Sequence, residues 1–354
     1  MKALILSGGK GTRLRPITHT GAKQLVPVAN KPILFYGVEA IRDAGITDVG
    51  IVVGDTEPEI RAALGDGSAF GIKTTYLRQQ APLGLAHAVK IAQDFMGKDS
   101  FVMYLGDNLI LDGITPLVRE FERDRPNSQI LLAHVPNPRE FGVAELDGTR
   151  VKRLTEKPKE PQSDLALVGV YMFDSSIFDS VNAIKPSARG ELEITDAIQH
   201  LIDHGKKVNC HIITGWWKDT GKLEDMLEAN RMVLSRARRS LRGTMDAKTR
   251  TEGEVIVGAG SVIENSILRG PLIIGERCEI RNSYIGPFTS IYDEVAIKNS
   301  EIEHSIVLER CVIQDIPVRI EGSLIGKEVR IQRSQLKPTA YRFMVGDSSL
   351  VDVL

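Results

Sequence analysis

Cysteine is scarce in this sequence, and the three cysteines among 354 residues are scattered at Cys210, Cys278 and Cys311. Because they lack CxxC spacing, they indicate neither a zinc site nor a disulfide framework. No stretch approaches the roughly 20 apolar residues that a membrane helix needs. The apolar run at residues 3–6 is too short for a secretory signal. We therefore expect a cytoplasmic protein without a membrane partner.

An excess of either charge is also missing, since 45 Lys and Arg residues stand against 46 Asp and Glu residues. Proteins that bind a polyanion usually carry a basic excess, so we expect no nucleic-acid partner and only local phosphate binding. Hydrophobic residues make up 42% of the chain, enough to bury a large core. A chain of 354 residues exceeds an ordinary domain of roughly 100 to 200 residues, so two domains are expected.

The first two thirds of the chain alternate β-branched runs with amphipathic segments, which predicts an α/β domain with a Rossmann-like mixed sheet. The predicted strands are residues 3–6, 49–53, 74–77, 101–105 and 130–134, and the predicted helices are residues 32–44, 58–64, 85–95, 191–205 and 223–234. We assign residues 1–240 to this domain and residues 241–252 to a linker. The arginines at residues 231–242 are typical of a solvated helix face at such a boundary, with a phosphate patch as the alternative.

Past residue 251 the helical periodicity stops and an internal repeat begins. Asn-Ser pairs start at Asn265, Asn282 and Asn299, 17 residues apart, and aliphatic columns keep the same spacing. Markers five or six residues apart within each unit predict three short strands per turn, and hence a parallel β-helix over residues 253–354 with a C-terminal tail. A β-sandwich would alternate without a fixed register. The tight corners are expected at Gly258, Gly275 and Gly286.

The strongest local signal is a glycine-rich turn directly after the first predicted strand, Gly8-Gly9-Lys10-Gly11-Thr12-Arg13. Glycines there let backbone N–H groups approach a polyphosphate, and the cations can neutralise its charge. A dinucleotide fold would require GxGxxG and a P-loop would require GKS or GKT, and neither pattern is present. A second cation set follows in Lys23-Gln24-Leu25-Val26-Pro27-Val28 and in Lys31-Pro32.

The combination GGxGTRLxPxT, KQLVPV and KPI resembles the sugar nucleotidyltransferases, most closely the long-form glucose-1-phosphate thymidylyltransferases that end in a left-handed β-helix. Further matching motifs follow in order: LGDN at 105–108, FGV at 141–143, EKP at 156–158, RGELEITD at 189–196 and WKDTG at 217–221. The resemblance implies that dTTP and glucose 1-phosphate form dTDP-glucose and pyrophosphate, for activated deoxysugar biosynthesis, with Mg²⁺ as the cofactor.

The resemblance also implies roles for individual residues. The catalytic residues would be Arg13, Lys23 and Asp107, and Mg²⁺ would be held by Asp107 and Asp219. The nucleotide would contact Leu6, Gly8, Gly9, Gly11, Thr12, Arg13, Gln79 and Gly84. The sugar phosphate would contact Gly142, Glu156, Lys157 and Leu167. Outside these motifs, such cations would be surface salt bridges and such aspartates would be turn or cap residues.

Three alternative functions remain at this point. A uridylyltransferase would read the same base edge, although Gln24 after Lys23 resembles the thymidylyl group. A bifunctional acetyltransferase would need a catalytic histidine, and residues 253–336 contain only His304. A noncatalytic nucleotide-sugar sensor would have lost Arg13 or Asp107. We expect the coils to organise a homo-oligomer, a trimer or tetramer, and to be dispensable for the chemistry.

Overall fold

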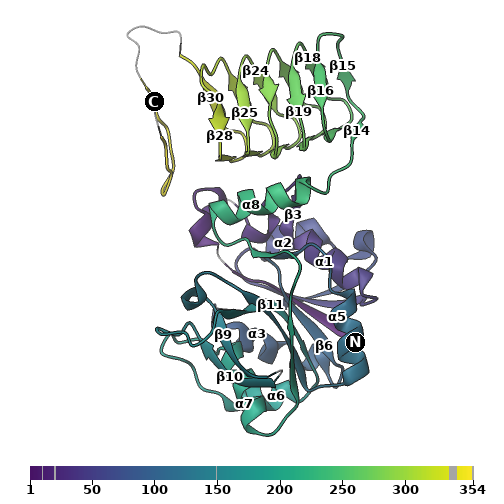
Figure 1. The fold of residues 1–354 in the computed structure, drawn as a ribbon, viewed down its shortest axis with the longest axis vertical. Coiled ribbons are helices and arrows are strands. Elements are labelled where there is room, and N and C mark those ends of the chain that lie inside the picture. The colour runs from purple at the N-terminus through teal and green to yellow at the C-terminus, as the bar shows by residue number, and fades with distance from the viewer. Residues whose placement is uncertain (10, 20, 149, 335–340, 353–354) are drawn as a thin grey trace. The chain divides into compact units, whose positions relative to one another are not determined.

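The computed structural model describes residues 1–9, 11–19, 21–148, 150–334 and 341–352, so Lys10 of the glycine-rich turn lies outside the described residues. The chain divides into two compact units, each assembled from several segments (Figure 1). The first unit comprises residues 1–10, 21–25 and 33–219, and the second comprises residues 11–20, 26–32 and 220–354. Within the described ranges, no helix combines the length and apolarity needed to cross a membrane.

The first unit is built on a nine-stranded mixed sheet, which confirms the α/β fold predicted from the sequence. β1 (Lys2–Ser7) pairs in parallel with β4 (Asp48–Val53) and β6 (Phe101–Leu105), whereas β11 (Leu165–Phe173) pairs antiparallel with β6. The remaining strands of the sheet are β5 (Lys73–Arg78), β8 (Ser128–His134), β9 (Gly142–Asp147), β10 (Arg150–Glu156) and β12 (Val208–Ile212). Every predicted strand is present.

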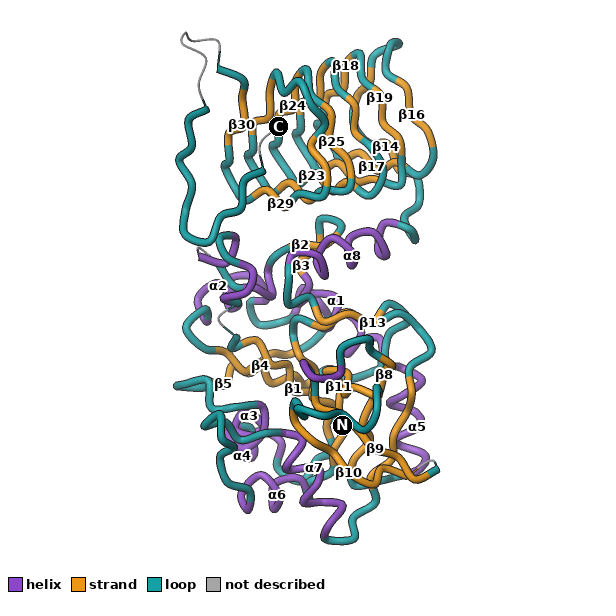
Figure 2. Tube along the Cα trace, turned by 60° about the vertical axis from the view of Figure 1, so that its left-hand side comes forward, coloured by secondary structure: helices purple, strands orange, loops and turns teal. Residues whose placement is uncertain are grey.

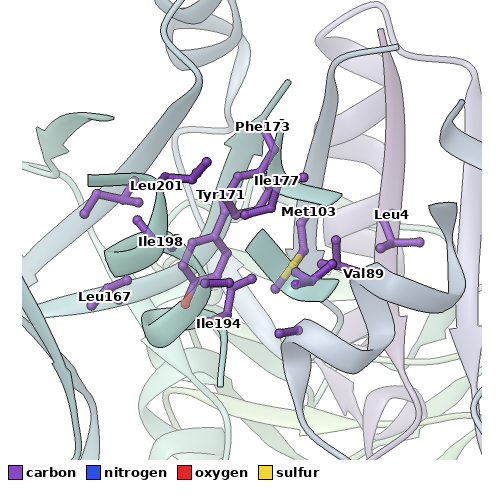
Figure 3. Close-up of a cluster of buried hydrophobic side chains, with 14 of the residues drawn as sticks. Leu4, Val89, Met103, Leu167, Tyr171, Phe173, Ile177, Ile194, Ile198 and Leu201 are labelled. Atoms are coloured by element: carbon purple, nitrogen blue, oxygen red, sulfur yellow. The ribbon is translucent and has the colours of Figure 1, made fainter. Parts of the chain in front are cut away.

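Helices cover both faces of this sheet (Figure 2). In β1, Leu4 and Leu6 face one core while Ala3 and Ile5 face the other, because side chains alternate along a strand. The core on the first face includes Leu4, Met103 and Tyr171 (Figure 3). The helices of that face are α3 (Leu85–Ile91), α4 (Gln93–Met96), α6 (Ile177–Ala183) and α7 (Ile194–Asp203), and those of the other are α1 (Ile33–Asp43), α2 (Glu57–Leu64) and α5 (Thr115–Asp124).

The second unit contains the predicted parallel β-helix, whose coils stack as three parallel sheets (Figure 1). Its strands are β14 (Ser240–Leu241), β15 (Thr244–Met245), β16 (Arg250–Glu252), β17 (Val255–Val257), β18 (Val262–Glu264), β19 (Ile267–Arg269), β20 (Leu272–Ile274), β21 (Glu279–Arg281), β22 (Tyr284–Ile285), β23 (Thr289–Ile291), β24 (Ala296–Lys298), β25 (Glu301–Glu303), β26 (Ile306–Val307), β27 (Val312–Gln314), β28 (Ile320–Glu321), β29 (Leu324–Ile325) and β30 (Arg330–Gln332). The unit also holds α8 (Leu223–Leu234) and the hairpin of β2 (Pro27–Val28) and β3 (Lys31–Pro32).

The 17-residue repeat sets the register between coils, since Ile263 pairs with Ile280 and Ile280 pairs with Ile297. Residues 241–252, where the sequence suggested a linker, include β15 and β16, which pair in parallel with β18 and β19. This first coil carries few aliphatic residues, because only one neighbouring coil covers it. The stack therefore begins with β14 at Ser240.

The backbone conformation at the corners of the coils accounts for the repeated asparagine. Asn265, Asn282 and Asn299 all adopt left-handed backbone angles, with φ of 46°, 48° and 47°. Asparagine tolerates this conformation, and its amide also bonds the next coil, with Asn265 Nδ2 donating to Asn282 Oδ1 at 2.8 Å. At Gly258 the requirement is different, since a Cβ there would lie 2.4 Å from the carbonyl oxygen of Gly275 in the next coil.

Candidate active site

Two carboxylates from distant parts of the chain meet at the carboxyl end of β6. Asp107 lies two residues after this strand, and the short strand β7 (Asn108–Ile110) pairs antiparallel with β13 (Trp217–Asp219). The register of this pair places Asp219 opposite Asn108, next to Asp107. Trp217 Nε1 donates a hydrogen bond of 2.7 Å to Asn108 Oδ1, which fixes the ladder. The two predicted metal ligands are therefore close neighbours.

Lys23 is the counter-ion of Asp107 in this site. It lies in the 3₁₀ turn Lys23–Leu25, its side chain is 9% exposed, and its ammonium forms an ion pair with the Asp107 carboxylate. Burial alone would raise the pKa of Asp107, but the Lys23 ammonium and the hydrogen bonds to the carboxylate bring that pKa below its ordinary value. The ion pair places the Lys23 side chain in the site, where electrostatic chemistry on a phosphate requires a cation.

The end of β1 faces two glutamine side chains. A Cβ on Gly8 would lie 3.6 Å from Gln79 Oε1, and a Cβ on Gly9 would lie 3.6 Å from Gln24 Nε2. Gln24 is only 2% exposed, and its Oε1 has no hydrogen-bond partner among the described residues. A buried acceptor of this kind is an available ligand contact. The sequence analysis gave Gln24 no role in binding, although it lies in the KQLVPV motif.

Gly11, Thr12 and Arg13 of the glycine-rich turn belong to the second unit. Gly11 has a φ of 63°, Thr12 and Arg13 are exposed in the 3₁₀ turn Thr12–Leu14, and Thr18 Oγ1 donates to the Gly11 carbonyl at 2.6 Å. The turn therefore presents the Arg13 guanidinium to solvent, where an anionic ligand can reach it.

Gln79 is held by its own loop. Its Nε2 donates to the Gly84 carbonyl at 3.2 Å and lies 3.0 Å from His87 Nδ1. Burial, with Lys90 nearby, lowers the pKa of His87, so the neutral ring accepts this second bond. Both amide hydrogens are thus used, and Oε1 is left facing Gly8. The resemblance places Gln79 at the nucleotide, and in this geometry its side chain offers an acceptor suited to a ring N–H.

The backbone conformation and close packing at residue 84 require a glycine there. Its φ is 101°, and a Cβ there would lie 2.3 Å from the Leu192 carbonyl oxygen. Ala86 N donates to that same oxygen at 3.0 Å, and Leu192 N donates to the Leu83 carbonyl at 2.8 Å. The RGELEITD segment therefore anchors the loop that carries Gln79.

Three of the residues expected at the sugar phosphate lie together. Glu156 at the end of β10 pairs with Gly142 of β9, and a Cβ on Gly142 would lie 3.1 Å from Glu156 Oε2 and 3.2 Å from Leu167 Cδ1. Lys157 follows Glu156, with a φ of 41° and its N–H donating to the Phe141 carbonyl at 3.0 Å. These backbone bonds hold the cluster in place.

The electrostatics of Glu156 are unusual. Burial raises the pKa of its carboxyl, the nearby Glu193 carboxylate raises it further, and Lys157 and Arg189 only partly oppose them. Arg189 Nη1 lies 3.3 Å from Glu156 Oε1 and 3.6 Å from Glu193 Oε1. Arg189 also pairs with Glu191, and Thr195 Oγ1 donates to Glu156 Oε2 at 3.3 Å, so the Glu156 carboxylate already accepts a hydroxyl donor of the kind that a sugar presents. RGELEITD thus contributes Arg189 and Glu193, which the sequence analysis did not assign to the site.

Comparison with known proteins identifies the family of the chain. Residues 2–236 match the family described as Nucleotidyl transferase. The chain is 58% identical over 356 residues to a glucose-1-phosphate thymidylyltransferase of Streptomyces antibioticus, covering 100% of this chain and 99% of the relative. It is 54% identical to one of Streptomyces griseus, covering 100% of this chain and 99% of the relative. A crystal structure from Bacillus anthracis, assigned as a glucose-1-phosphate thymidylyltransferase in complex with sucrose, superposes with a TM-score of 0.62 at 39% identity, over 66% of this chain and 94% of that one.

Proposed function

The chain belongs to the nucleotidyl transferase family, and from this premise we propose that it forms dTDP-glucose and pyrophosphate from dTTP and glucose 1-phosphate. The observation that carries the proposal is the buried Lys23–Asp107 pair beside Asp219, at the carboxyl end of a sheet strand where α/β proteins bind ligands. Full-length similarity to two thymidylyltransferases supports the choice of substrates.

The reaction joins two anions, so the protein must neutralise charge and hold the reactants in line. A phosphate oxygen of glucose 1-phosphate attacks the α-phosphorus of dTTP, and the bond from that phosphorus to the β-phosphate oxygen breaks to release pyrophosphate. Arg13 and Lys23 stabilise charge on the α-phosphate and the leaving group, and Lys157 holds the sugar's phosphate. Glu156 and the backbone at Gly142 and Leu167 orient the hydroxyls. The nucleotide is held by Leu6, Gly8, Gly9, Gly11, Thr12, Gln79 and Gly84.

Asp107 and Asp219 fit a magnesium ion. Both supply carboxylate oxygens, the ligand type that this hard cation prefers, and Mg²⁺ usually takes only one or two protein ligands beside water and phosphate oxygens. Within the described residues, no cluster of three or more His, Cys, Asp or Glu side chains could form an all-protein metal cage. When bound, Mg²⁺ would supply positive charge at the phosphates.

A direct test measures pyrophosphate release over a grid of dTTP and UTP against several sugar 1-phosphates. We expect the highest kcat/KM with dTTP and glucose 1-phosphate in the presence of Mg²⁺. Equal or faster reaction with UTP would favour the uridylyltransferase alternative. Acetyl transfer from acetyl coenzyme A to the product or substrate would establish the bifunctional one. No pyrophosphate release from any pair would contradict the proposed function.

We also propose that the protein assembles as a homo-oligomer, a trimer or tetramer. The regular coils of the β-helix offer a repeated surface that suits a symmetric contact, and Ile267 in β19 is 40% exposed on it. Light scattering of the full-length chain tests this, and a monomeric mass would contradict it.

His87 is expected to support base recognition through Gln79. In His87→Ala the Gln79 amide loses one of its two bonds, which is worth about 1 kcal/mol, so KM for dTTP should rise roughly fivefold with kcat little changed. Steady-state kinetics with dTTP varied would measure the effect. His134→Ala on β8 is the control, because His134 is exposed and its Nδ1 lies 2.9 Å from Asp164 Oδ2. An unchanged KM in His87→Ala would contradict this role.

Glu156→Gln should weaken sugar-phosphate binding while stabilising the fold at high pH. Because folding raises the pKa of Glu156, the protonated carboxyl stabilises the folded state at acid pH. This contribution to the free energy of unfolding is lost as the pH rises through the raised pKa. The variant should therefore melt higher than the wild type at pH 8, with the difference vanishing near pH 4, while KM for glucose 1-phosphate rises about tenfold. Melting curves at both pH values and steady-state kinetics measure the two effects. A lower melting temperature at pH 8 would refute the electrostatic account.

A further inference from the structure

Two histidines at the end of α7 lie face to face. His200 is in the last turn of this helix and His204 is its C-cap residue, so the two are four positions apart and share one face. The centroids of the two imidazole rings are 3.9 Å apart, with an angle of 24° between the ring planes. His200 is partly buried and His204 is exposed, so a small solute can reach the pair from solvent.

The Nδ1 atom of each ring is engaged by a neighbouring group. His204 Nδ1 lies 2.8 Å from the His200 carbonyl oxygen, and because a carbonyl can only accept, this Nδ1 carries the proton. The lone pair of the neutral His204 ring is therefore on Nε2. His200 Nδ1 lies 3.0 Å from the hydroxyl of Ser180 on α6, which can accept a hydrogen bond in the same way. When both Nδ1–H groups donate, both Nε2 atoms offer a lone pair.

The two helices around this pair form a firm support within the first unit (Figure 1). Val181 of α6 and Leu201 of α7 belong to one buried core, and Ser180 between them is only 1% exposed. The hydroxyl that faces the His200 ring is therefore fixed in position. The pair also lies at the carboxyl end of α7, where the last carbonyl groups of a helix favour a cation.

We propose that His200 and His204 bind one divalent transition-metal ion of the class of Zn²⁺ through their Nε2 atoms, and that Ser180 is the positioning residue for His200. Histidines that bind a metal usually donate their other ring N–H to a fixed oxygen, which is the arrangement found here. Tetrahedral Zn²⁺, at about 2.1 Å from each nitrogen, holds two nitrogens roughly 3.4 Å apart, comparable with the separation of the rings.

The proposed ion differs in chemistry from the magnesium that Asp107 and Asp219 fit. Imidazole nitrogen suits zinc, copper and nickel, whereas Mg²⁺ prefers oxygen. Among the residues that the structure describes, no group of three or more His, Cys, Asp or Glu side chains could hold a metal, so water completes the coordination at this pair. The site does not depend on the proposed function, because no substrate takes part in it.

Calorimetric titration of Zn²⁺ into the full-length, metal-free chain tests the proposal, with excess Mg²⁺ present to occupy oxygen sites. We expect saturable binding of one Zn²⁺ per chain and a higher melting temperature, since an ion that binds the folded state stabilises it. His204→Ala should weaken zinc binding about a hundredfold, because attachment at two points becomes attachment at one. His211→Ala is the matched control, because the ring of His211 contacts the Glu120 carboxylate instead.

Ser180→Ala tests the positioning role, since loss of the group that orients a metal ligand should weaken zinc binding about tenfold. Zinc affinity equal to that of the wild type would overturn this role. The metal site itself would be overturned by a wild type without saturable zinc binding, by displacement of zinc with Mg²⁺, or by equal affinity in His204→Ala. A chain that binds zinc but releases no pyrophosphate would instead refute the proposed function alone.

Discussion

Asp107→Asn should lower turnover about a thousandfold, because it removes a proposed magnesium ligand and the counter-ion of Lys23 in one change. The amide can still accept a hydrogen bond, but it cannot neutralise the buried ammonium, so the melting temperature should fall as well. Turnover measured across a magnesium titration, together with a melting curve, reports both effects. Asp147→Asn, at an exposed position on β9, controls for the loss of a carboxylate as such.

Asp219→Asn distinguishes the effect of losing a proposed magnesium ligand from the effect of losing the ion pair to Lys23. Asp219 lies beside Asp107 through the β7–β13 ladder, whereas the ion pair to Lys23 is made by Asp107. This variant should raise the magnesium concentration for half-maximal activity about tenfold or more. Its turnover at saturating magnesium should exceed that of Asp107→Asn. Wild-type activity in both variants at low magnesium would refute the shared metal site.

The local patterns that were predictable from the sequence are those that repeat or alternate. The alternation in β1 and the 17-residue columns of the β-helix each reflect one side-chain periodicity, and the structure has both. The predicted helix at residues 85–95 is instead divided into α3 and α4 at Ala92, whose ψ of −1° interrupts the helical backbone. The strand β16 was not predicted from the sequence, because Arg250–Glu252 contains no aliphatic residue.

The supporting contacts of the site were not predictable, because they join residues far apart in the chain. The bond from Trp217 Nε1 to Asn108 Oδ1 spans 109 positions, and the ion pair of Lys23 joins it to Asp107 in a different part of the chain. Motif matching identified Asp107 and Asp219 individually, whereas only the β7–β13 register makes them neighbours. His87 carries no sequence signal, since its role depends on the loop that brings its Nδ1 to Gln79.

Arg13→Ala and Lys157→Ala should produce different kinetic defects, since the proposal assigns the two cations to opposite reactants. In this proposal Arg13 stabilises charge that develops on the α-phosphate and pyrophosphate, so its loss should lower kcat about a hundredfold or more. In the same proposal Lys157 binds the sugar's phosphate in the ground state and the transition state alike, so its loss should raise KM for glucose 1-phosphate about thirtyfold with a smaller change in kcat.

Both side chains are exposed, so neither replacement should change the melting temperature appreciably, and the kinetics can be compared on intact proteins. Arg15→Ala and Lys159→Ala are matched controls, because each removes an exposed cation two residues from the one under test. Initial rates with each substrate varied at saturating levels of the other give the four constants for every variant. If Arg13→Ala and Lys157→Ala change the same constant to the same extent, the assignment of one cation to each reactant is wrong, because a shared defect means that both cations act on one phosphate.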